Sequence, residues 1–423
     1  MSEFSCEIVD KNSKKNSLEF DIKGNNDYGF DKTIINGIRR TLLSTIPSVA
    51  FRTERDNSDL IVLKNNTSLH NEFILHRLSL IPLYIDPEVF KKGLLFHLKV
   101  ENKTNQLKPI TAKDIEIYKV KPSIIEECRK KDDYSILENI SMDNYDMSDI
   151  GRLTEKEKEN IFRPFKYKDF VDYCLITELG ATTSKDNIQE LDIYGSPSVS
   201  TCQEKTCWQA VSCSTYSFKE DEDLFVKVAK EKMVINNISH ENQQKFLKEL
   251  QFSESERYFH RDKNLQPYWY NFKVDSQSFY DSKELLMKAC DILTTTFEGV
   301  KLELKKSLDP DSDSLFKIKK SDENNDIVYK LQMTGGDDTI GALMQSHISN
   351  KYINDDSPLA LCGYKKLHPL EEIITFTISL NTSNAIIKLN NSQRIVSIIE
   401  MFCQCCEDIN IIYQKIKETF ETI

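Results

Sequence analysis

The chain has 423 residues, and its 67 acidic side chains outnumber the 56 basic ones, which gives a net charge of −11 at pH 7. This length suggests about two to three domains, and the acidic balance argues against broad binding of nucleic acid by this chain alone, because phosphate binding needs clustered cations. With only 12 glycines and 11 prolines, the chain is not expected to contain long disordered linkers or glycine-rich cofactor loops.

The cysteine content and the apolar runs indicate the compartment. Eleven cysteines cannot all pair internally, because the number is odd. The first residues lack the basic and apolar segments of a signal peptide, and no apolar run approaches the roughly 18–20 residues of a membrane helix. We therefore expect a reducing, soluble compartment, in which most cysteines are small buried apolar residues.

The N-terminal region reads as two strands followed by a helix. Residues 4–9 and 18–22 are the predicted strands, and the polar residues 11–17 are the turn between them. The helix is predicted over 31–46, ended by Pro47, which cannot continue the hydrogen-bond ladder. At 100° per residue its apolar positions share one face; they are Ile34, Ile35, Ile38, Leu42 and Ile46.

The middle of the chain, residues 56–264, reads as mixed strands and loops. Its predicted strands are 94–100, 115–120, 173–178, 188–194 and 208–216. Thr154 and Glu157 form a capping box that opens a short charged helix. The acidic run 220–223 is interpreted as a solvated surface segment.

The order strand, strand, helix recurs late in the chain. Strands are predicted over 315–319 and 328–333, a turn over 321–326 and a helix over 338–348. When the two predicted helices are aligned with each other, Thr33 corresponds to Thr339, Ile34 to Ile340 and Arg39 to Gln345. We interpret the pattern as a diverged internal repeat, with chance similarity as the alternative.

Each repeat is followed by one long amphipathic helix. Ser282 is the predicted cap of the first, whose apolar stripe consists of Leu285, Leu286, Ala289, Ile292, Leu293 and Phe297. The second is predicted over 392–420, and its stripe consists of Ile395, Ile398, Ile399, Phe402, Cys405, Cys406, Ile409, Ile412, Tyr413, Ile416 and Phe420. Stripes of this length must be buried, and pairing of the two halves about a pseudo-twofold axis buries both.

These patterns predict an α+β fold with two pseudo-twofold-related dimerization modules, each a small antiparallel sheet with long packed helices. The predicted domains are 1–55 and 265–305 for the first module, 56–264 for a mainly β insert domain, 306–314 for a linker and 315–423 for the second module. The predicted interface between the modules consists of Ile34, Ile38, Leu42, Leu286, Ile292, Leu293, Phe297, Ile340, Leu343, Ile395, Ile399, Phe402, Ile409 and Ile416.

Several motifs fall short of a chemical site. Gly24 to Gly29 has the glycine spacing of a phosphate loop but lacks the following Lys-Ser/Thr, and the Asp309-x-Asp-x-Asp313 pattern lacks the glycine and glutamate of a calcium loop. Cys202, Cys207 and Cys213 lack the paired spacing of structural zinc sites. We therefore predict no catalytic residue, no metal and no cofactor. Cys207 paired with His240 or His260 remains an alternative, as a thiol-dependent enzyme.

Two sequence blocks carry a family resemblance. The first runs from Asn36-Gly-Ile-Arg-Arg40 to Phe51 and continues from Asn66-Thr-Ser to Leu-Ile-Pro-Leu83. It resembles the α-like components of multisubunit RNA polymerases: bacterial α, the archaeal D polypeptide and the third-largest subunit of eukaryotic polymerase II. The second, 337–343 with 360–371, resembles the archaeal L polypeptide and the eleventh subunit of polymerase II. Such a fusion is similar to the combined subunit of large cytoplasmic DNA viruses.

The resemblance implies a function. The chain would be a non-catalytic assembly platform of a DNA-directed RNA polymerase, a nucleotidyltransferase complex, and its intramolecular α-like dimer would dock the second-largest, β-like subunit. The matching partner-binding residues are Asn36, Arg39, Arg40, Asn66, Glu72, His76 and Arg77; internal hydrogen bonding and solvation are their alternative roles.

Further partners implied are a small zinc-bundle, tenth-like subunit and a twelfth-like subunit, with DNA reached only through the complex and no membrane contact. The expected location is the virion and host cytoplasm for a viral protein, and otherwise the nucleus. The alternative function is a free-standing adaptor or transcription regulator that reuses the dimer fold. One departure from the family is Gly37 in place of alanine, which by propensity loosens the helix by roughly 0.5–1 kcal/mol.

Overall fold

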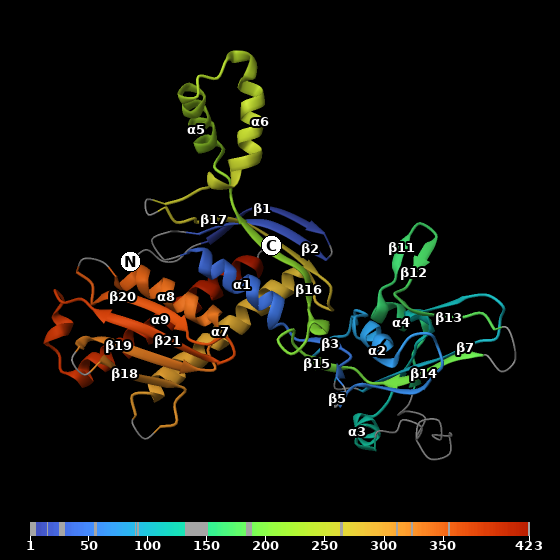
Figure 1. Ribbon diagram of the computed structural model, residues 1–423. Helices are drawn as coiled ribbons and strands as arrows, with labels where there is room; N and C mark the ends of the chain where they lie inside the picture. Colours follow the sequence, from blue (N-terminus) through green and yellow to red (C-terminus); the bar gives the residue numbers. More distant parts are fainter. Residues whose placement is uncertain are drawn as a thin grey trace. The chain divides into compact units, whose positions relative to one another are not determined.

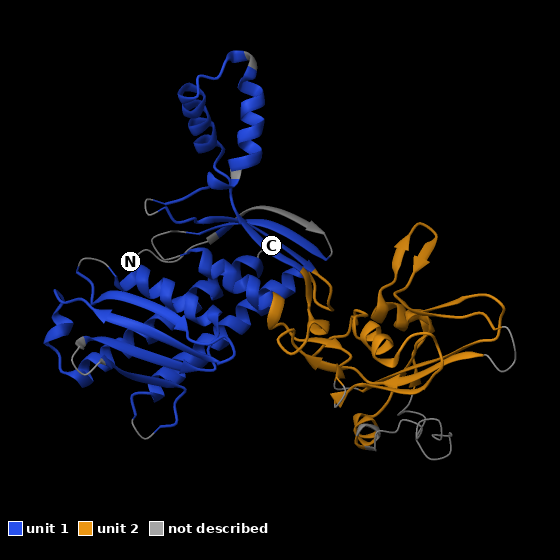
Figure 2. Ribbon diagram, viewed as in Figure 1, with its two compact units in different colours: residues 1–42, 213–275, 282–423 blue, residues 43–212, 276–281 orange. Residues whose placement is uncertain are grey.

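The computed structural model describes residues 6–14, 16–24, 30–54, 57–88, 90, 93–131, 151–182, 188–262, 265–309, 312–322, 325–353 and 356–421. The chain divides into two compact units, each built from segments that are distant in sequence (Figure 2). Unit 1 comprises residues 1–42, 213–275 and 282–423, and unit 2 comprises 43–212 and 276–281. The predicted insert, 56–264, therefore contains residues of both units.

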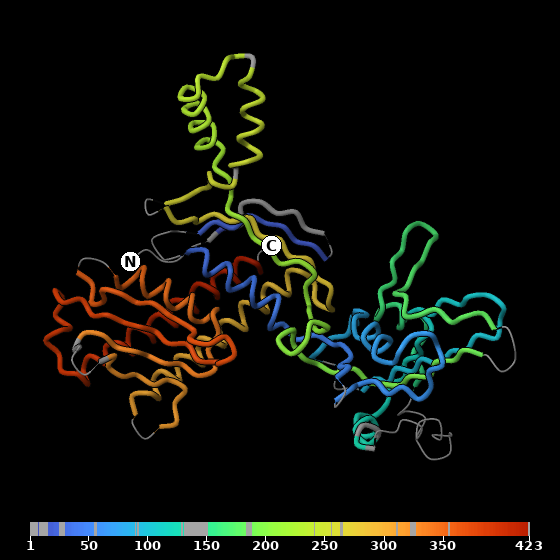
Figure 3. Tube along the Cα trace, viewed as in Figure 1, coloured from blue at the N-terminus to red at the C-terminus, as the bar shows by residue number. Residues whose placement is uncertain are grey.

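Unit 1 contains two four-stranded antiparallel sheets. The first has the order β1-β2-β17-β16 and the second the order β18-β19-β21-β20. The strands are β1 (Cys6–Lys14), β2 (Ser17–Gly24), β16 (Val211–Phe218), β17 (Trp269–Ser276), β18 (Phe316–Asp322), β19 (Asn325–Thr334), β20 (Leu359–Lys366) and β21 (Ile373–Leu380). In both sheets the last strand in sequence lies between the second and the third, so the connectivity is the same. Figure 3 shows β2 beside β17, although the chain between them is long.

Each sheet is accompanied by two helices in equivalent places in the chain. In what we call module 1, α1 (Lys32–Ser44) follows β2 and α7 (Ser282–Lys306) follows β17. In module 2, α8 (Asp338–Tyr352) follows β19, and the short helix η8 (Ala385–Lys388) and then α9 (Asn391–Glu421) follow β21. The predicted repeat thus includes two further strands in each half.

The helices pack on one another between the sheets of unit 1 (Figure 1). Helix α9 runs along α7 and also contacts α8. Two ion pairs show that α7 and α9 are antiparallel, since Lys417 Nζ lies 2.7 Å from Asp291 Oδ1 and Lys301 Nζ lies 2.6 Å from Glu407 Oε1. The predicted apolar stripe of α9 is buried apart from Ile395, which is half-buried. The long helical pattern was therefore a reliable guide to this layer.

Unit 2 is a β-rich domain with its own core. Its largest sheet has the order β10-β9-β7-β14-β6, and β8 pairs with β13, β3 with β15, β11 with β12 and β4 with β5. The elements are β3 (Ser48–Ala50), β4 (Thr53–Glu54), β5 (Asn57–Ser58), β6 (Leu60–Asn65), α2 (Asn71–Ser79), β7 (Leu94–Asn102), β8 (Lys108–Thr111), η3 (Ala112–Asp114), β9 (Glu116–Lys119), α3 (Pro122–Lys131), β10 (Gly151–Arg152), α4 (Glu155–Phe162), β11 (Phe165–Tyr167), β12 (Phe170–Asp172), β13 (Leu175–Leu179), β14 (Gln189–Gly195), β15 (Ser198–Ser200) and η5 (Thr206–Trp208).

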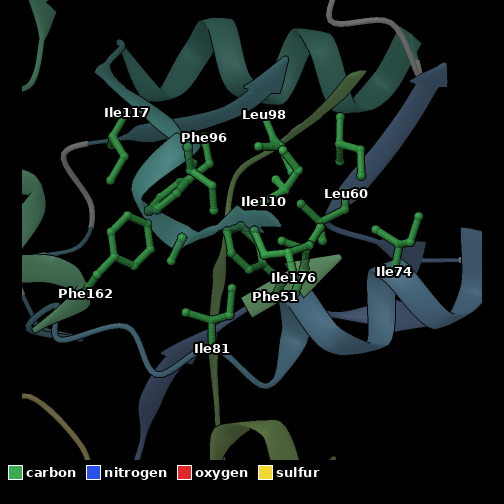
Figure 4. Close-up of a cluster of buried hydrophobic side chains, with 14 of the residues drawn as sticks. Phe51, Leu60, Ile74, Ile81, Phe96, Leu98, Ile110, Ile117, Phe162 and Ile176 are labelled. Atoms are coloured by element: carbon green, nitrogen blue, oxygen red, sulfur yellow. The ribbon is translucent and has the colours of Figure 1, made fainter. Parts of the chain in front are cut away.

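The core of unit 2 is formed by aromatic and branched side chains from strands and from helices α2 and α4 (Figure 4). Phe96 lies edge-to-face between Phe51 and Phe162, with ring centroids 5.2 and 6.2 Å away. The five strands predicted between residues 94 and 216 correspond to β7, β9, β13, β14 and β16. The capping box is confirmed, because Thr154 accepts from Glu157 N and the Glu157 carboxylate accepts from Thr154 N.

Three features of the fold differ from the expectations. A helical hairpin, α5 (Glu222–Ile235) and α6 (Gln243–Glu254) with the short η6 (His240–Asn242) and η7 (Ser255–Arg257), belongs to unit 1 where strands and loops were expected. The acidic run begins it, since Asp221 caps α5 by accepting from Leu224 N. The predicted polar turn 11–17 is mostly strand, because β1 pairs with β2 as far as Lys14. Ser282 is the first residue of α7 and does not cap it; its hydroxyl is buried without a hydrogen-bond partner.

Some sequence predictions fall outside the described residues. They are the strand start at residues 4–5, most of the glycine-spaced loop 25–29 and the middle aspartate of the calcium-like pattern, residue 311.

Candidate docking surfaces and the helical core of unit 1

Asp31 fixes the start of α1. Its Oδ1 accepts from Thr33 N at 2.8 Å and from Thr33 Oγ1 at 2.6 Å, which satisfies donors that a helix start leaves free. Its Oδ2 accepts from Ser346 Oγ of α8. One carboxylate, only 7% exposed, therefore caps α1 and ties it to α8. Asp337 caps α8 in the same way, by accepting from Ile340 N at 3.0 Å.

The crossing of α1 with α8 and α9 is centred on Gly37. A Cβ placed on Gly37 would lie 2.5 Å from Tyr413 Oη and 3.2 Å from Leu343 Cδ1. Tyr413 is fully buried and donates to the carbonyl of Ile34 at 3.2 Å. Burial raises the pKa of Tyr413 well above its usual value, so the hydroxyl remains a donor. Gly37, which by propensity only weakens a helix, is thus required here because the helices leave no space for a side chain.

Contacts between α1 and α8 are nearly reciprocal when Thr33 is aligned with Thr339. At the same spacing, Gly37 corresponds to Leu343, and these two positions face each other. Arg40 corresponds to Ser346. Arg40 Nε donates to Thr339 Oγ1 in the first turn of α8 at 2.8 Å, and Ser346 donates to the cap of α1. Arg40 and its mate Ser346 therefore each bind the start of the opposite helix, although Thr339 and Asp31 are not mates in the alignment.

Most of the predicted interface residues lie in this helical core. Ile34, Ile38, Leu42, Leu286, Leu293, Phe297, Leu343, Ile399, Phe402, Ile409 and Ile416 are buried, whereas Ile292, Ile340 and Ile395 are half-buried. Sequence reasoning missed Asp31, and it placed Tyr413 in the apolar stripe of α9 without predicting its hydrogen bond to α1. A buried polar contact between distant segments leaves no periodic signal in the sequence.

The core also contains a buried charged group at the contact of α8 with α9. Asp408 accepts from His347 Nε2 at 3.1 Å, from Lys351 Nζ and from Gln404 Nε2 at 3.2 Å. Burial would raise the pKa of Asp408, but these hydrogen bonds outweigh it and lower the pKa to about 2. The carboxylate therefore remains ionised in the folded protein at neutral pH.

The predicted partner-binding residues of α1 are half-exposed. Arg39 Nε donates to Asn36 Oδ1 at 2.8 Å, one turn earlier on the same helix. Arg40 Nε donates a hydrogen bond to Thr339 of module 2. Of this arginine pair, Arg39 is therefore the one without a bond to the other module in the contacts described, and it is the better candidate for a partner.

The remaining predicted residues lie in unit 2. Asn66 is anchored to the segment at β14, because its Nδ2 donates to Ile188 O at 2.8 Å and its Oδ1 accepts from Glu190 N. Arg77 donates to Leu175 O at 3.0 Å. Glu72 and His76, four residues apart on α2, are exposed. The structure thus assigns internal bonds to the first two and leaves the other two side chains accessible.

Two exposed apolar residues lie close to Glu72 and His76 in the chain, Phe73 between them and Leu80 after the helix. Phe73 is 66% exposed and Leu80 is 54% exposed, while Ile74 and Leu78 on the opposite side of α2 are buried. Sequence reasoning did not single out Phe73 or Leu80. Phe73 and Leu80 could have been identified because they lie outside the buried stripe of α2. This requires knowing which side of α2 faces the core.

A comparison of the sequence with models of protein families identifies a family for this chain. The family model described as RNA polymerase Rpb3/Rpb11 dimerisation domain matches residues 27–297, more than half of the chain. The chain belongs to this family. The matched range runs from the start of α1 to α7 and includes unit 2, so the dimerisation domain is interrupted by the β-rich unit.

The relatives that this chain matches are named as RNA polymerase subunits. The chain is 38% identical over 78 residues to the human "DNA-directed RNA polymerases I and III subunit RPAC1", and the match covers 18% of this chain and 19% of the relative. The protein of the same name from Dictyostelium discoideum is 34% identical over 94 residues, 22% of each chain. The chain thus aligns with about a fifth of the length of these relatives.

The cysteines of this Rpb3/Rpb11 family chain offer little support for thiol chemistry. Burial raises the pKa of Cys207 to about 11, so the thiol is protonated at neutral pH. Cys207 lies in unit 2, and His240 and His260 lie in unit 1. His260 is stacked on Trp269, with centroids 4.6 Å apart.

The described residues contain neither a cluster of potential metal ligands nor a helix that could span a membrane. These residues contain no group of three or more His, Cys, Asp or Glu side chains that could hold a metal ion. Within the same ranges, no helix has both the length and the apolar character needed to cross a membrane.

Proposed function

We propose that this chain is a non-catalytic assembly-platform subunit of a DNA-directed RNA polymerase. Modules 1 and 2 would form an intramolecular α-like dimer, and one face of this dimer would dock the second-largest, β-like subunit. Membership of the Rpb3/Rpb11 family and the similarity to RPAC1 support the polymerase assignment.

The observation that carries the dimer proposal is the nearly reciprocal contact between α1 and α8. In a twofold interface residue i contacts j and residue j contacts i, and residues on the axis face their own mates. Gly37 opposite its mate Leu343 follows this rule. Arg40 and its mate Ser346 come close to it, because each binds the start of the opposite helix, at Thr339 and Asp31. The shared connectivity of the two sheets supports the same conclusion.

Module 2 would then be the equivalent of the small eleventh subunit. The family match ends at residue 297, so this assignment depends on the topology of β18 to α9 and on the resemblance of residues 337–343 and 360–371. Joining both partners in one chain raises the effective concentration of the second to the order of 1 mM. Assembly of the dimer would therefore not depend on the concentration of two separate proteins.

We further propose two docking elements for the large subunit. On α1 the guanidinium of Arg39 would bind a carboxylate of the partner, for which its planar donor set is suited. On α2, Glu72, Phe73 and His76 would form a second contact, in which an exposed aromatic ring lies between polar groups, as in many interaction hot spots. The small zinc-bundle and twelfth-like subunits, a viral origin, and location in the virion and host cytoplasm or else the nucleus are proposals of the resemblance alone.

Co-purification tests the function. A tagged chain is isolated from the cells that make it, and the polymerase subunits bound per chain are quantified by mass spectrometry for the unchanged protein and for Arg39→Ala with Phe73→Ala. We expect the double variant to retain its fold and to lose at least about tenfold of the second-largest subunit, which corresponds to about 1.4 kcal/mol. Arg257→Ala, at an arginine that is 73% exposed and on neither docking element, is the matched control.

Purification of the unchanged chain without large polymerase subunits would contradict the proposed function and favour a free-standing adaptor. Equal recovery of the large subunit by the double variant would contradict only the two docking elements.

A further inference from the structure

The four-stranded sheet of module 2 has an inner face that packs on the helices and an outer face. Side chains alternate between the two faces along a strand. Phe376 of β21 marks the inner face, because its ring lies 5.3 Å from that of Phe402 on α9. The cross-strand partners of the alternate positions define the outer face. Its residues are Lys317 and Lys319 on β18, Val328, Lys330, Gln332 and Thr334 on β19, Leu361, Gly363 and Lys365 on β20, and Ile373, Thr375, Thr377 and Ser379 on β21.

The outer face carries positive charge that no carboxylate on it balances. Four of the residues just named are lysines, and none is acidic. Lys319 and Lys330 lie directly opposite each other on neighbouring strands, where like charges destabilise a sheet. Within the described residues, none of the four lysines makes an ion pair, in contrast to Lys306 and Lys351 on the helices of unit 1. A repulsive arrangement of this kind is expected where the charges serve to bind an anion.

The equivalent face of module 1 balances its charges. On β2 the outer residues Glu19 and Asp21 alternate with the buried Phe20. Glu19 lies opposite Lys273 of β17, and Asp21 Oδ2 lies 2.6 Å from Lys219 Nζ. The sheet of module 1 therefore forms without an unbalanced positive face, so the lysines of module 2 are not a requirement of the fold.

The polar groups between the lysines match those that bind phosphate. One row across the sheet runs from Lys317 through Gln332 and Thr375 to Lys365. Lysine, threonine and glutamine side chains are all common donors to phosphate oxygens. Protein interfaces are instead poor in lysine and enriched in aromatic, methionine and arginine residues, and none of these three kinds is among the outer-face residues named above. The composition therefore favours a nucleic-acid backbone over an acidic polypeptide.

The outer face also favours a duplex over a single strand. Proteins that bind single strands stack the bases on aromatic side chains, which the described outer positions do not include. A duplex keeps its bases inside and presents two lines of phosphates. Neighbouring strands are about 4.8 Å apart, so lysines at the two edges of the sheet are about 14 Å apart and can contact both lines. Glu371 and Glu372 are exposed just before β21, which limits the contact to the face itself.

We propose that the outer face of module 2 binds the phosphate backbone of duplex DNA without reading its sequence. The choice of DNA over duplex RNA rests on the proposed function, a subunit of a DNA-directed RNA polymerase, whereas the site depends only on the sheet of module 2. This contact would be direct, in addition to the contact through the complex that the resemblance implies. Because the chain carries a net charge of −11, binding should be confined to this face, weak and strongly dependent on salt.

Binding of a labelled duplex by the isolated full chain tests the proposal. Fluorescence anisotropy of a duplex of about 20 base pairs at several salt concentrations gives the slope of log K against log salt, which should be no steeper than about −3.6 for four phosphates. Lys319→Gln with Lys330→Gln should reduce the size of this slope by about 1.8 and weaken binding at low salt at least about tenfold. Lys245→Gln with Lys248→Gln on α6 removes the same charge from two exposed lysines and should change the affinity by less than about twofold.

The variant Lys319→Glu separates binding from folding. The change turns the repulsive pair with Lys330 into an attractive one, so the midpoint of urea unfolding should rise. DNA binding should nevertheless fall at least about tenfold, because the face loses positive charge. A fall of both quantities would attribute the loss of binding to the fold and would overturn the inference.

The inference would also be overturned by absence of duplex binding at the lowest salt, or by equal slopes for the two double variants. Tighter binding of the single strand or of duplex RNA of the same sequence would overturn it too, as would stronger competition from poly-glutamate than from unlabelled duplex. Recovery of the large polymerase subunits by co-purification is a separate measurement, and it reports on the proposed function alone.

Discussion

Module 1 carries a whole β-rich unit between its first helix and its third strand, whereas module 2 joins the equivalent elements through residues 353–358. Both modules nevertheless have the same strand order. The sheet and its two helices therefore do not need the insertion in order to form. What differs is the connection before the long helix: in module 1 residues 276–281 belong to unit 2, whereas in module 2 Ala385, Ile386 and Leu389 line a surface groove.

The two modules also differ within their shared helical core. Gly37 stands where module 2 has Leu343, and, at the same spacing, Thr41 stands where module 2 has His347. The crossing is therefore asymmetric in volume, with a glycine opposite a leucine, and only module 2 places a histidine beside a buried aspartate there. A single chain permits this asymmetry, because each half can specialise for its mate.

The largest expected effect is at the centre of the crossing. Leu343→Ala should lower the free energy of unfolding of unit 1 by about 2–5 kcal/mol, because it removes a buried side chain and leaves a cavity. Hydrogen exchange of the α9 amides measures this change. Leu361→Ala, at a leucine that is 53% exposed on β20, should change it by less than about 0.5 kcal/mol. Equal effects of the two variants would show that the crossing does not hold the modules together.

The second prediction compares two helical glycines. Gly37→Ala should destabilise unit 1 by about 1–3 kcal/mol, because the added methyl group would overlap the hydroxyl of Tyr413. Gly299→Ala on α7 should instead stabilise it by about 0.5–1 kcal/mol, since no atom beyond its chain neighbours and the backbone of its own helix lies within 4 Å of the new Cβ. Urea unfolding measures both changes. Adding Tyr413→Phe should recover part of the loss from Gly37→Ala, and independence of these two changes would contradict the steric explanation.

Sequence patterns predicted the parts of this fold that depend on long apolar periodicity. The stripe of α9 could be identified because its residues repeat over the whole helix and are buried. The α5–α6 hairpin was missed because, among its described side chains, only Ala229 and Leu250 are buried on the two helices. A helix with so little buried surface has no clear apolar stripe.

The site was predictable to a smaller extent. Sequence motifs identified Arg39 and Arg40 together, but the bond from Arg40 to Thr339 separates their roles. Gly37 was interpreted through helix propensity. A glycine is needed there because the hydroxyl of a tyrosine hundreds of residues later in the chain leaves no space for a side chain. Contacts of this kind depend on how two helices cross, which local sequence does not specify.

The smallest predicted effect concerns acid stability. The pKa of Asp408 is lowered to about 2 in the folded protein, whereas an unfolded aspartate has a pKa of about 3.9. A lowered pKa stabilises the folded state above the unfolded value, so this contribution is present above about pH 4 and is lost as the pH falls toward 2. The largest contribution of this carboxylate to the free energy of unfolding is about 2.6 kcal/mol. Asp408→Asn should therefore show a shallower loss of stability than the unchanged protein between pH 4 and 2.

Hydrogen exchange of α8 and α9 amides across this range measures the difference, and Glu418→Gln is the control, because that side chain is 64% exposed. Since module 1 has Thr41 at the position of His347, the acid-dependent loss should appear first in the contact of α8 with α9. Parallel pH profiles for Asp408→Asn and the unchanged protein would mean that the hydrogen bonds to Asp408 do not favour its ionised form, and the proposed electrostatic difference between the modules would then be lost.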